Sequence, residues 1–204
     1  MFKKLASEAL GLSDIGVIVP PADFNKVDAD DYLFSEDGER IFFLIKSKKD
    51  EYCFTNLALI HVDGDSAVSS KRTIRRYDYA THGIHHVTLE TAGTIDMDIE
   101  LKFQLEGGEG FSIDVRKNFI EQLKDLYKAL LSISRMQAHN AKARDNALSC
   151  LEPLGQMYKL GGDAGDPQRV VAQYEALVAA VNRQQLEKLS PRDFGAVFER
   201  YLHN

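Results

Sequence analysis

The sequence contains only two cysteines, Cys53 and Cys150, among its 204 residues. Two cysteines cannot form the disulfide framework of a small secreted domain or a CxxC-based zinc site. Their scarcity is typical of a reducing compartment. No apolar run approaches the roughly 20 residues that a transmembrane helix needs. The first stretch, Met1–Leu12, carries Glu8 among its apolar residues, so it is not interpreted as a secretory signal. These features predict a cytoplasmic protein without an integral membrane segment.

Motifs of the common enzyme classes are also lacking. The chain has no GxSxG, HExxH, GxxxxGK or GxGxxG, and its glycine clusters at 107–110 and 161–165 lack the strand-to-helix setting of a phosphate loop. The sequence therefore predicts no catalytic residue, no cofactor and no enzymatic activity. The formal net charge of −6 disfavours nucleic acid and anionic membranes as partners.

Composition divides the chain into three predicted regions. Residues 1–134 hold 16 basic and 23 acidic residues, whereas residues 135–204 hold 9 and 8. Residues 1–27 are predicted as an N-terminal helix over Phe2–Leu10 followed by a linker at Pro20–Asp23. Residues 28–134 form the predicted β-rich domain. Residues 135–204 form the predicted helical region.

The β-rich region predicts about seven antiparallel strands closed by one helix. Residues 95–105 alternate strictly between apolar and polar side chains, which indicates a strand with one buried and one wet face. An apolar stripe begins at Phe119, after Asn118 and Glu121 in capping-box spacing. We therefore predict an α+β fold: a seven-stranded antiparallel barrel or sandwich, capped by a helix over 118–132. The predicted strands are 41–45, 51–55, 57–62, 68–79, 84–89, 95–105 and 111–115.

Helical periodicity continues after this cap. Apolar and small residues repeat with heptad spacing from Met136 to Met157, and Pro153 is expected to kink that helix. A second helix is predicted to begin at Asp166-Pro167, and a third after Ser190-Pro191. The simplest arrangement is an antiparallel helical hairpin with a tail.

Three short motifs resemble the bacterial pleckstrin-homology (PH) domain family. Tyr52-Cys53-Phe54-Thr55-Asn56 resembles the Thr-Asn turn of that family, and Glu90-Thr91-Ala92-Gly93 with Asp96-Met97-Asp98-Ile99-Glu100-Leu101 resembles its acidic strand. The resemblance covers residues 28–134. By their position in the chain and their residue pattern, the helices after residue 134 resemble the YvbH-like oligomerisation region that accompanies such domains.

The resemblance implies a PH-like, non-enzymatic domain that assembles into symmetric, ring-like homo-oligomers. The sequence departs from the family pattern at Asn56-Leu57-Ala58, where a basic residue is common. Relatives that bind phosphoinositides use basic residues in their first hairpin. Here we take that turn to be Glu36-Asp37-Gly38-Glu39, which would repel phosphate, so specific phosphoinositide binding is not expected.

The remaining chemistry-bearing residues favour ordinary structural roles. His85 and His86 are neighbours on a predicted strand and point to opposite faces, so with His61 and His82 they make a poor metal site. Four cations, Lys71, Arg72, Arg75 and Arg76, form a candidate anion site, but alternation also divides them between two faces. Cys53 and Cys150 are expected to be buried.

Apolar positions on the helices after residue 134 are the predicted oligomer interface. A short hairpin has little core of its own in which to bury so many apolar side chains. The predicted interface residues are Met136, Ala143, Cys150, Met157, Tyr174, Leu177, Phe194, Phe198 and Tyr201. The leading functional hypothesis is a self-assembling scaffold with an unidentified protein partner. The alternative is a peripheral membrane or anionic-ligand binding protein.

Overall fold

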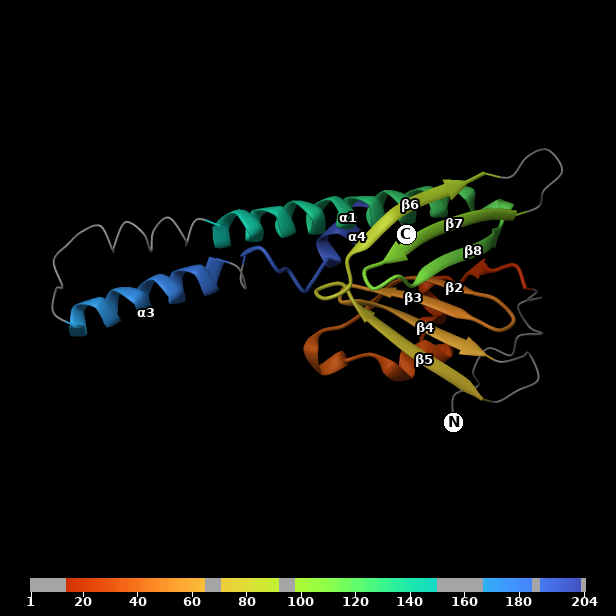
Figure 1. Ribbon diagram of the computed structural model, residues 1–204. Helices are drawn as coiled ribbons and strands as arrows, with labels where there is room; N and C mark the ends of the chain where they lie inside the picture. The colour runs from red at the N-terminus through yellow and green to blue at the C-terminus, as the bar shows by residue number, and fades with distance from the viewer. Residues whose placement is uncertain (1–13, 65–70, 92–97, 150–166, 185–187, 203–204) are drawn as a thin grey trace. The chain divides into compact units, whose positions relative to one another are not determined.

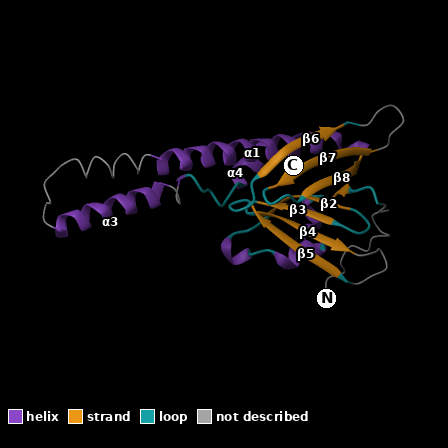
Figure 2. Ribbon diagram, viewed as in Figure 1, coloured by secondary structure: helices purple, strands orange, loops and turns teal. Residues whose placement is uncertain are grey.

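A computed structural model describes residues 14–64, 71–91, 98–149, 167–184 and 188–202 (Figure 1). Two antiparallel sheets form its β-rich part, one with the order β1-β2-β3-β4-β5 and one with the order β6-β7-β8 (Figure 2). The first sheet contains β1 (Val17–Ile18), β2 (Ile41–Lys46), β3 (Glu51–Thr55), β4 (Ala58–Gly64) and β5 (Arg72–Asp78). The second contains β6 (Ile84–Glu90), β7 (Asp98–Leu105) and β8 (Gly110–Arg116). The predicted α+β, PH-like class is confirmed. The strand beyond the expected seven is β1, which is only two residues long.

The alternation in the second sheet produces the expected two-faced strands. Along β7 the apolar residues Ile99, Leu101, Phe103 and Leu105 are buried, and the polar residues between them are not. β8 pairs with β7 over its whole length and alternates in the same way. The buried face of this sheet joins the main hydrophobic core, which also contains Phe43, Ile45, Phe54 and Leu59 from the first sheet.

The middle of the first sheet, from β2 to β4, is buried on both faces. The sequences of β2, β3 and β4 are nearly continuous apolar runs, a pattern typical of strands with no solvent-exposed face. One face belongs to the main core. Side chains on the opposite face form a second core, made by Val19, Val27, Ala29, Leu44, Cys53, Ile60 and Val62.

The second core is covered by the chain segment that follows Pro20, whose first residues were predicted to form a linker. After Pro20 the backbone forms three 3-10 helices, η2 (Pro21–Lys26), η3 (Asp28–Tyr32) and η4 (Ser35–Asp37). η2 contacts β2, and η3 contacts β3 and β4. Figure 1 shows this part of the chain, in orange, on the side of the first sheet away from β6, β7 and β8. Pro20–Asp23 leads into this segment, and the residues that pack on the sheet follow it, among them Phe24, Val27 and Ala29.

A close backbone approach at Gly16 joins the two sheets. The Gly16 N–H donates to the Asp114 carbonyl at 2.7 Å, and the Arg116 N–H donates to the Gly16 carbonyl at 3.0 Å. A Cβ atom at position 16 would lie 2.7 Å from Cγ2 of buried Ile45. Glycine is required here because any side chain would displace the core or break the bridge.

A long helix, α1 (Ile120–Ser149), follows the last strand through the short η5 (Lys117–Phe119). The predicted stripe faces the core, and Leu123, Leu126, Leu130 and Ile133 are fully buried. The sequence analysis expected a cap helix ending near residue 132 and a second helix from Met136. The two are one continuous helix, because Ser-Ile-Ser-Arg between them contains no proline or glycine.

The chain then returns to the main core at its C-terminal end. Phe194, immediately before α4 (Gly195–Tyr201), is 1% exposed and Phe198 is 0% exposed. The Phe198 ring stacks on Phe42 with 5.4 Å between centroids, and the Phe194 ring meets Tyr79 edge-on at 5.8 Å. These aromatic contacts make α4 part of the β-rich domain.

The Thr-Asn turn between β3 and β4 fixes this return. The Phe194 N–H donates to the Asn56 carbonyl at 2.8 Å, and Asn56 Nδ2 donates to Asp193 Oδ2 at 2.7 Å. Asn56 Oδ1 also accepts the Arg40 N–H at 2.9 Å. One buried asparagine therefore connects β2, the β3–β4 turn and the C-terminal segment.

Two compact units result, one of residues 1–134 with 192–204 and one of residues 135–191. The second unit contains the end of α1 and α3 (Pro167–Arg183), and Arg144 Nη1 donates to the Leu189 carbonyl within it. The first unit is interrupted after residue 134, and residues 192–204 group with it rather than with the helical residues before them. Residues 14–27, which the sequence analysis placed before the β-rich domain, are also part of that unit.

Some predicted features lie outside the described residues: the Phe2–Leu10 helix, Pro153, and the glycine-rich stretch 161–165. In the part of the chain that is described, no helix is long and apolar enough to cross a membrane.

Replacing Phe198 tests the C-terminal return. Phe198→Ala removes a fully buried ring, and we expect the free energy of unfolding to fall by about 3–5 kcal/mol. Arg200→Ala, in the same helix but exposed, serves as the control and should change it by less than about 0.5 kcal/mol. Urea unfolding followed by circular dichroism measures both. A loss below about 1 kcal/mol for Phe198→Ala would contradict the packing described above.

Candidate functional site

The four predicted cations do not gather into one anion site. Lys71 precedes β5, and the three arginines lie on alternating sides of the strand, as the spacing predicted. Arg75 Nη1 lies 2.8 Å from Asp63, and Arg72 Nε lies 3.7 Å from Asp28. Arg76 contacts Glu39 and Asp78 at 2.9 and 2.8 Å. Each arginine thus lies beside a carboxylate of its own chain.

The acidic turn Glu36–Glu39 is not the first hairpin, which corrects the sequence analysis. It begins inside η4 and ends just before β2, and the first pair of long strands, β2 and β3, is joined by Ser47–Asp50. That turn carries the exposed residues Lys48 and Lys49. Repulsion by an acidic first hairpin is therefore no argument against phosphate at this end of the sheet.

The histidines and Cys53 take structural positions. His61 is 9% exposed and stacks on Tyr52 with 4.6 Å between ring centroids, whereas His85 and His86 are exposed. Among the described residues, no three His, Cys, Asp or Glu side chains are grouped to hold a metal ion. Burial raises the pKa of the Cys53 thiol well above its usual value, with nearby Glu51 adding to the effect. A protonated, inaccessible thiol is a poor nucleophile.

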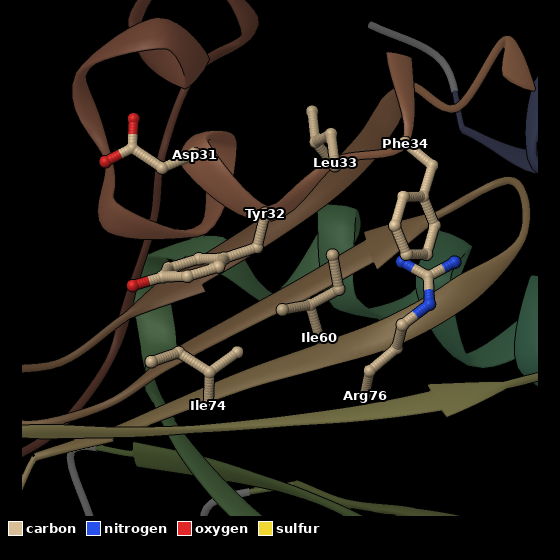
Figure 3. Close-up of a pocket in the computed structure, with 7 residues that line it drawn as sticks. All are labelled: Asp31, Tyr32, Leu33, Phe34, Ile60, Ile74 and Arg76. Atoms are coloured by element: carbon tan, nitrogen blue, oxygen red, sulfur yellow. The ribbon is translucent and has the colours of Figure 1, made fainter. Parts of the chain in front are cut away.

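One pocket with the shape of a binding site lies beneath the end of η3 and the residues that lead into η4, with a volume of about 350 Å³. Ile60 of β4 and Ile74 of β5 form its floor (Figure 3). Tyr32 and Phe34 flank the opening and are 44% and 51% exposed. The Arg76 guanidinium lies over the Phe34 ring at 4.5 Å from its centroid. Asp31 and Leu33 complete the lining.

Two buried glutamates hold the segment that makes this pocket. Glu51 Oε2 accepts the Ala29 N–H at 2.8 Å, Oε1 accepts the Asp28 N–H at 3.2 Å, and Lys46 pairs with the same carboxylate. Glu39 accepts the Phe34 N–H at 2.8 Å as well as the Thr55 hydroxyl at 2.6 Å. The segment is therefore fastened to both ends of β3, through Glu51 at its start and through Thr55 at its end.

Arg76 is the basic member of this network. Partial burial lowers the pKa of Arg76, but hydrogen bonds and charge from Glu39 and Asp78 outweigh that effect and leave the pKa raised. Its positive charge is balanced by these two carboxylates. The sequence analysis named Arg76 as a candidate ligand-binding residue but did not foresee Tyr32, Phe34 or Glu39. The available signal was the non-alternating β2 run Ile41–Ile45, which implies a second covered face.

The predicted interface residues divide into three groups. Met136 and Tyr174 are 40% and 67% exposed, and Ala143 and Leu177 are half-buried. Phe194, Phe198 and Tyr201 belong to the main core, which corrects their assignment to an interface. Their stripe faces the sheets of the same chain because the Asn56 contacts draw the C-terminal segment there. Cys150 and Met157 lie outside the described residues.

Three further exposed apolar side chains were not in the predicted set. Leu148 near the end of α1 is 50% exposed, and Val171 and Val178 on α3 are 55% and 38% exposed. Val171 and Val178 both lie on α3 (Pro167–Arg183). They accompany Tyr174 on the same side of the helix because residues three and four apart share a face.

Comparison with known proteins gives one matching family model, described as Bacterial PH domain, over residues 9–134. The uncharacterized protein YvbH of Bacillus subtilis (strain 168) is 50% identical over 211 aligned residues that include 100% of each chain. The uncharacterized protein YjqA of the same organism is 29% identical over 97 residues, covering 48% of this chain and 76% of that protein.

A solved structure gives the same result. The crystal structure of a PH domain containing bacterial protein from Exiguobacterium sibiricum 255-15 matches with a TM-score of 0.80 and 46% sequence identity. It covers 93% of this chain and 100% of that chain, so the likeness includes the helical residues beyond the matched domain.

Replacing Glu39 tests the network behind the pocket. Glu39→Ala leaves Arg76, the Thr55 hydroxyl and the Phe34 N–H without their shared acceptor, and we expect a loss of about 2–4 kcal/mol in the free energy of unfolding. Glu39→Gln keeps an acceptor but removes the charge, and should fall between this variant and the wild type. Exposed Glu36→Ala is the control. Equal stability of the position 39 and 36 variants in guanidinium titrations would contradict the network.

Proposed function

The chain belongs to the bacterial PH domain family, and on that basis we propose that it is a non-enzymatic scaffold that assembles with copies of itself through residues 135–191. The observation that carries the proposal is where large apolar side chains remain exposed. Of the seven in the described part of the chain, five lie in this second unit: Met136, Leu148, Val171, Tyr174 and Val178.

The exposed residues of α3 form a continuous stripe. Val171, Tyr174 and Val178 are separated by three and four residues, and half-buried Leu177 and Val181 lie beside them. This is the spacing by which helices pack against one another. A soluble protein rarely leaves such a stripe in water, so a second protein surface is expected to cover it.

Charge favours a second copy as that surface. Residues 135–204 contain 9 basic and 8 acidic residues, whereas residues 1–134 carry an excess of seven acidic ones. Copies that meet through the nearly neutral region avoid the repulsion that would oppose contact between the acidic domains. A symmetric contact also buries the same stripe on every copy at once.

The described residues support a binding role rather than a catalytic one. Cys53 is fully buried with a raised thiol pKa, and the β5 arginines lie beside carboxylates. A PH-like domain attached to an assembling hairpin would present several identical binding surfaces. Such repetition raises the avidity for a partner that is itself repeated or extended.

Charges placed on the α3 stripe test the assembly. We expect Tyr174→Glu/Val178→Glu to lower the mass of the wild-type assembly, because two carboxylates would be buried in the interface. Ala172→Glu/Ala179→Glu is the matched control, since at about 100° per residue these positions face the other side of α3. Light scattering measures the mass and far-ultraviolet circular dichroism checks the fold. Identical masses for the two variants would refute the role of this stripe.

The second expectation concerns lipids. We expect no headgroup-selective binding to phosphoinositides, because Arg72 and Arg76 lie beside Asp28 and Glu39 and the first 134 residues are acidic overall. Co-sedimentation with vesicles that contain phosphatidylinositol bisphosphate measures this. Binding that exceeds phosphatidylserine vesicles of equal charge, and that Arg72→Ala/Arg76→Ala or Lys48→Ala/Lys49→Ala abolishes, would contradict it.

A further inference from the structure

Exposed apolar surface occurs at a second place, the opening of the pocket beneath the end of η3 and the residues that lead into η4. Of the seven large exposed apolar side chains in the described ranges, the two outside residues 135–191 are Tyr32 and Phe34, and both line this pocket. Their rings flank a floor of Ile60 and Ile74 (Figure 3). An aromatic pair around an apolar floor is a typical binding surface for an apolar side chain.

The fold itself holds the residues that shape the pocket. Its floor belongs to two central strands, and Glu39 and Glu51 hydrogen-bond the backbone of the covering segment at Phe34, Ala29 and Asp28. Ile60 is fully buried within the second core. A preorganised site spends little free energy on ordering itself, so even a small contact area can bind usefully.

The surroundings of the pocket are strongly acidic. Residues 21–39 contain seven acidic residues and one lysine, a net charge of −6 that equals the net charge of the whole chain. Asp31, Glu36 and Asp37 are exposed. Arg76 pairs with Glu39, which is one of the seven, and with Asp78, so it removes only a small part of this negative charge. An approaching ligand therefore meets an apolar opening within a negative field.

We propose that this pocket binds a partner protein through one large apolar side chain flanked by lysine or arginine. The apolar side chain lies on Ile60 and Ile74 between Tyr32 and Phe34. Its basic neighbours face Asp31, Glu36 and Asp37. The volume of about 350 Å³ is at the small end of the range for ligand pockets, which suits one or two side chains rather than a long strand.

This site is separate from the proposed assembly surface. All residues of the pocket belong to the first unit, and the exposed stripe of α3 belongs to the second. Peptide binding should therefore be equal in the wild type and in Tyr174→Glu/Val178→Glu when binding is counted per chain. If assembly through residues 135–191 is disproved, peptide binding at the pocket is unaffected, and the reverse also holds.

Synthetic peptides test the pocket in the full chain. The probe is a fluorescein-labelled peptide with a central phenylalanine and two lysines on each side. One control peptide replaces the phenylalanine with alanine, and another replaces the lysines with glutamates. Fluorescence anisotropy should show at least tenfold weaker binding for the alanine peptide and no binding for the glutamate peptide. Binding should weaken as salt increases, since charge complementarity contributes to it.

Substitutions in the protein locate the site. Tyr32→Ala/Phe34→Ala should weaken the phenylalanine peptide at least fivefold and leave the alanine peptide unchanged, since both rings are about half exposed and little folding energy depends on them. Glu36→Gln/Asp37→Asn should weaken both lysine-containing peptides and reduce the salt dependence. Glu121→Gln/Asp125→Asn, which removes two carboxylates of α1, is the control and should bind as the wild type does.

Three results would overturn the proposal. The first is equal affinity for the phenylalanine and alanine peptides, which would leave only a nonspecific charge effect. The second is unchanged binding in Tyr32→Ala/Phe34→Ala. The third is a lower assembly mass in Tyr32→Ala/Phe34→Ala without any loss of peptide affinity, which would make this surface a contact between copies of the chain.

Discussion

The strands β2, β3 and β4 carry apolar side chains on both faces, and each face needs its own cover. The second sheet, α1 and the aromatic residues around α4 cover one face. The 3-10 segment of residues 21–37 covers the other. Because irregular backbone cannot pair with the sheet, buried carboxylates take over that role, and Glu39 and Glu51 accept its N–H groups. The candidate pocket exists because this cover reaches β4 and β5 without filling the space above Ile60 and Ile74.

The same constraint explains the exposed stripe in the second unit. Phe194 and Phe198 return to complete the main core, and Asn56 fixes the backbone of that return. Residues 135–191 are thereby an insertion whose two ends both enter the first unit. The aromatic residues that could have served the hairpin are used elsewhere. The apolar side chains of α3 are left exposed, which is the basis for expecting a second copy to cover them.

Regular periodicity was readable from the sequence, whereas long-range partners were not. The alternation of β7, the stripe of α1 and the short motifs were enough to predict a PH-like α+β fold. Phe194, Phe198 and Tyr201 also read correctly as one apolar helix face, but periodicity does not say which surface covers a face. Prolines and polar residues at Pro20–Asp23 favour irregular backbone, and the sequence did not show that the irregular residues after them pack on the sheet. The pocket depends on Glu39 and Glu51, whose partners lie between 5 and 37 residues away.

The most direct test of the central claim compares two chains by sedimentation equilibrium at about 100 µM. One is the intact chain, and in the other a Gly/Ser linker of about six residues replaces residues 146–187. The Arg144–Leu189 contact and the C-terminal return are retained in the second. We expect a mass that is a multiple of 22.9 kDa for the intact chain, and a folded monomer for the shortened one. An intact chain that sediments at 22.9 kDa, or a shortened chain that keeps the full assembly, would contradict the central claim.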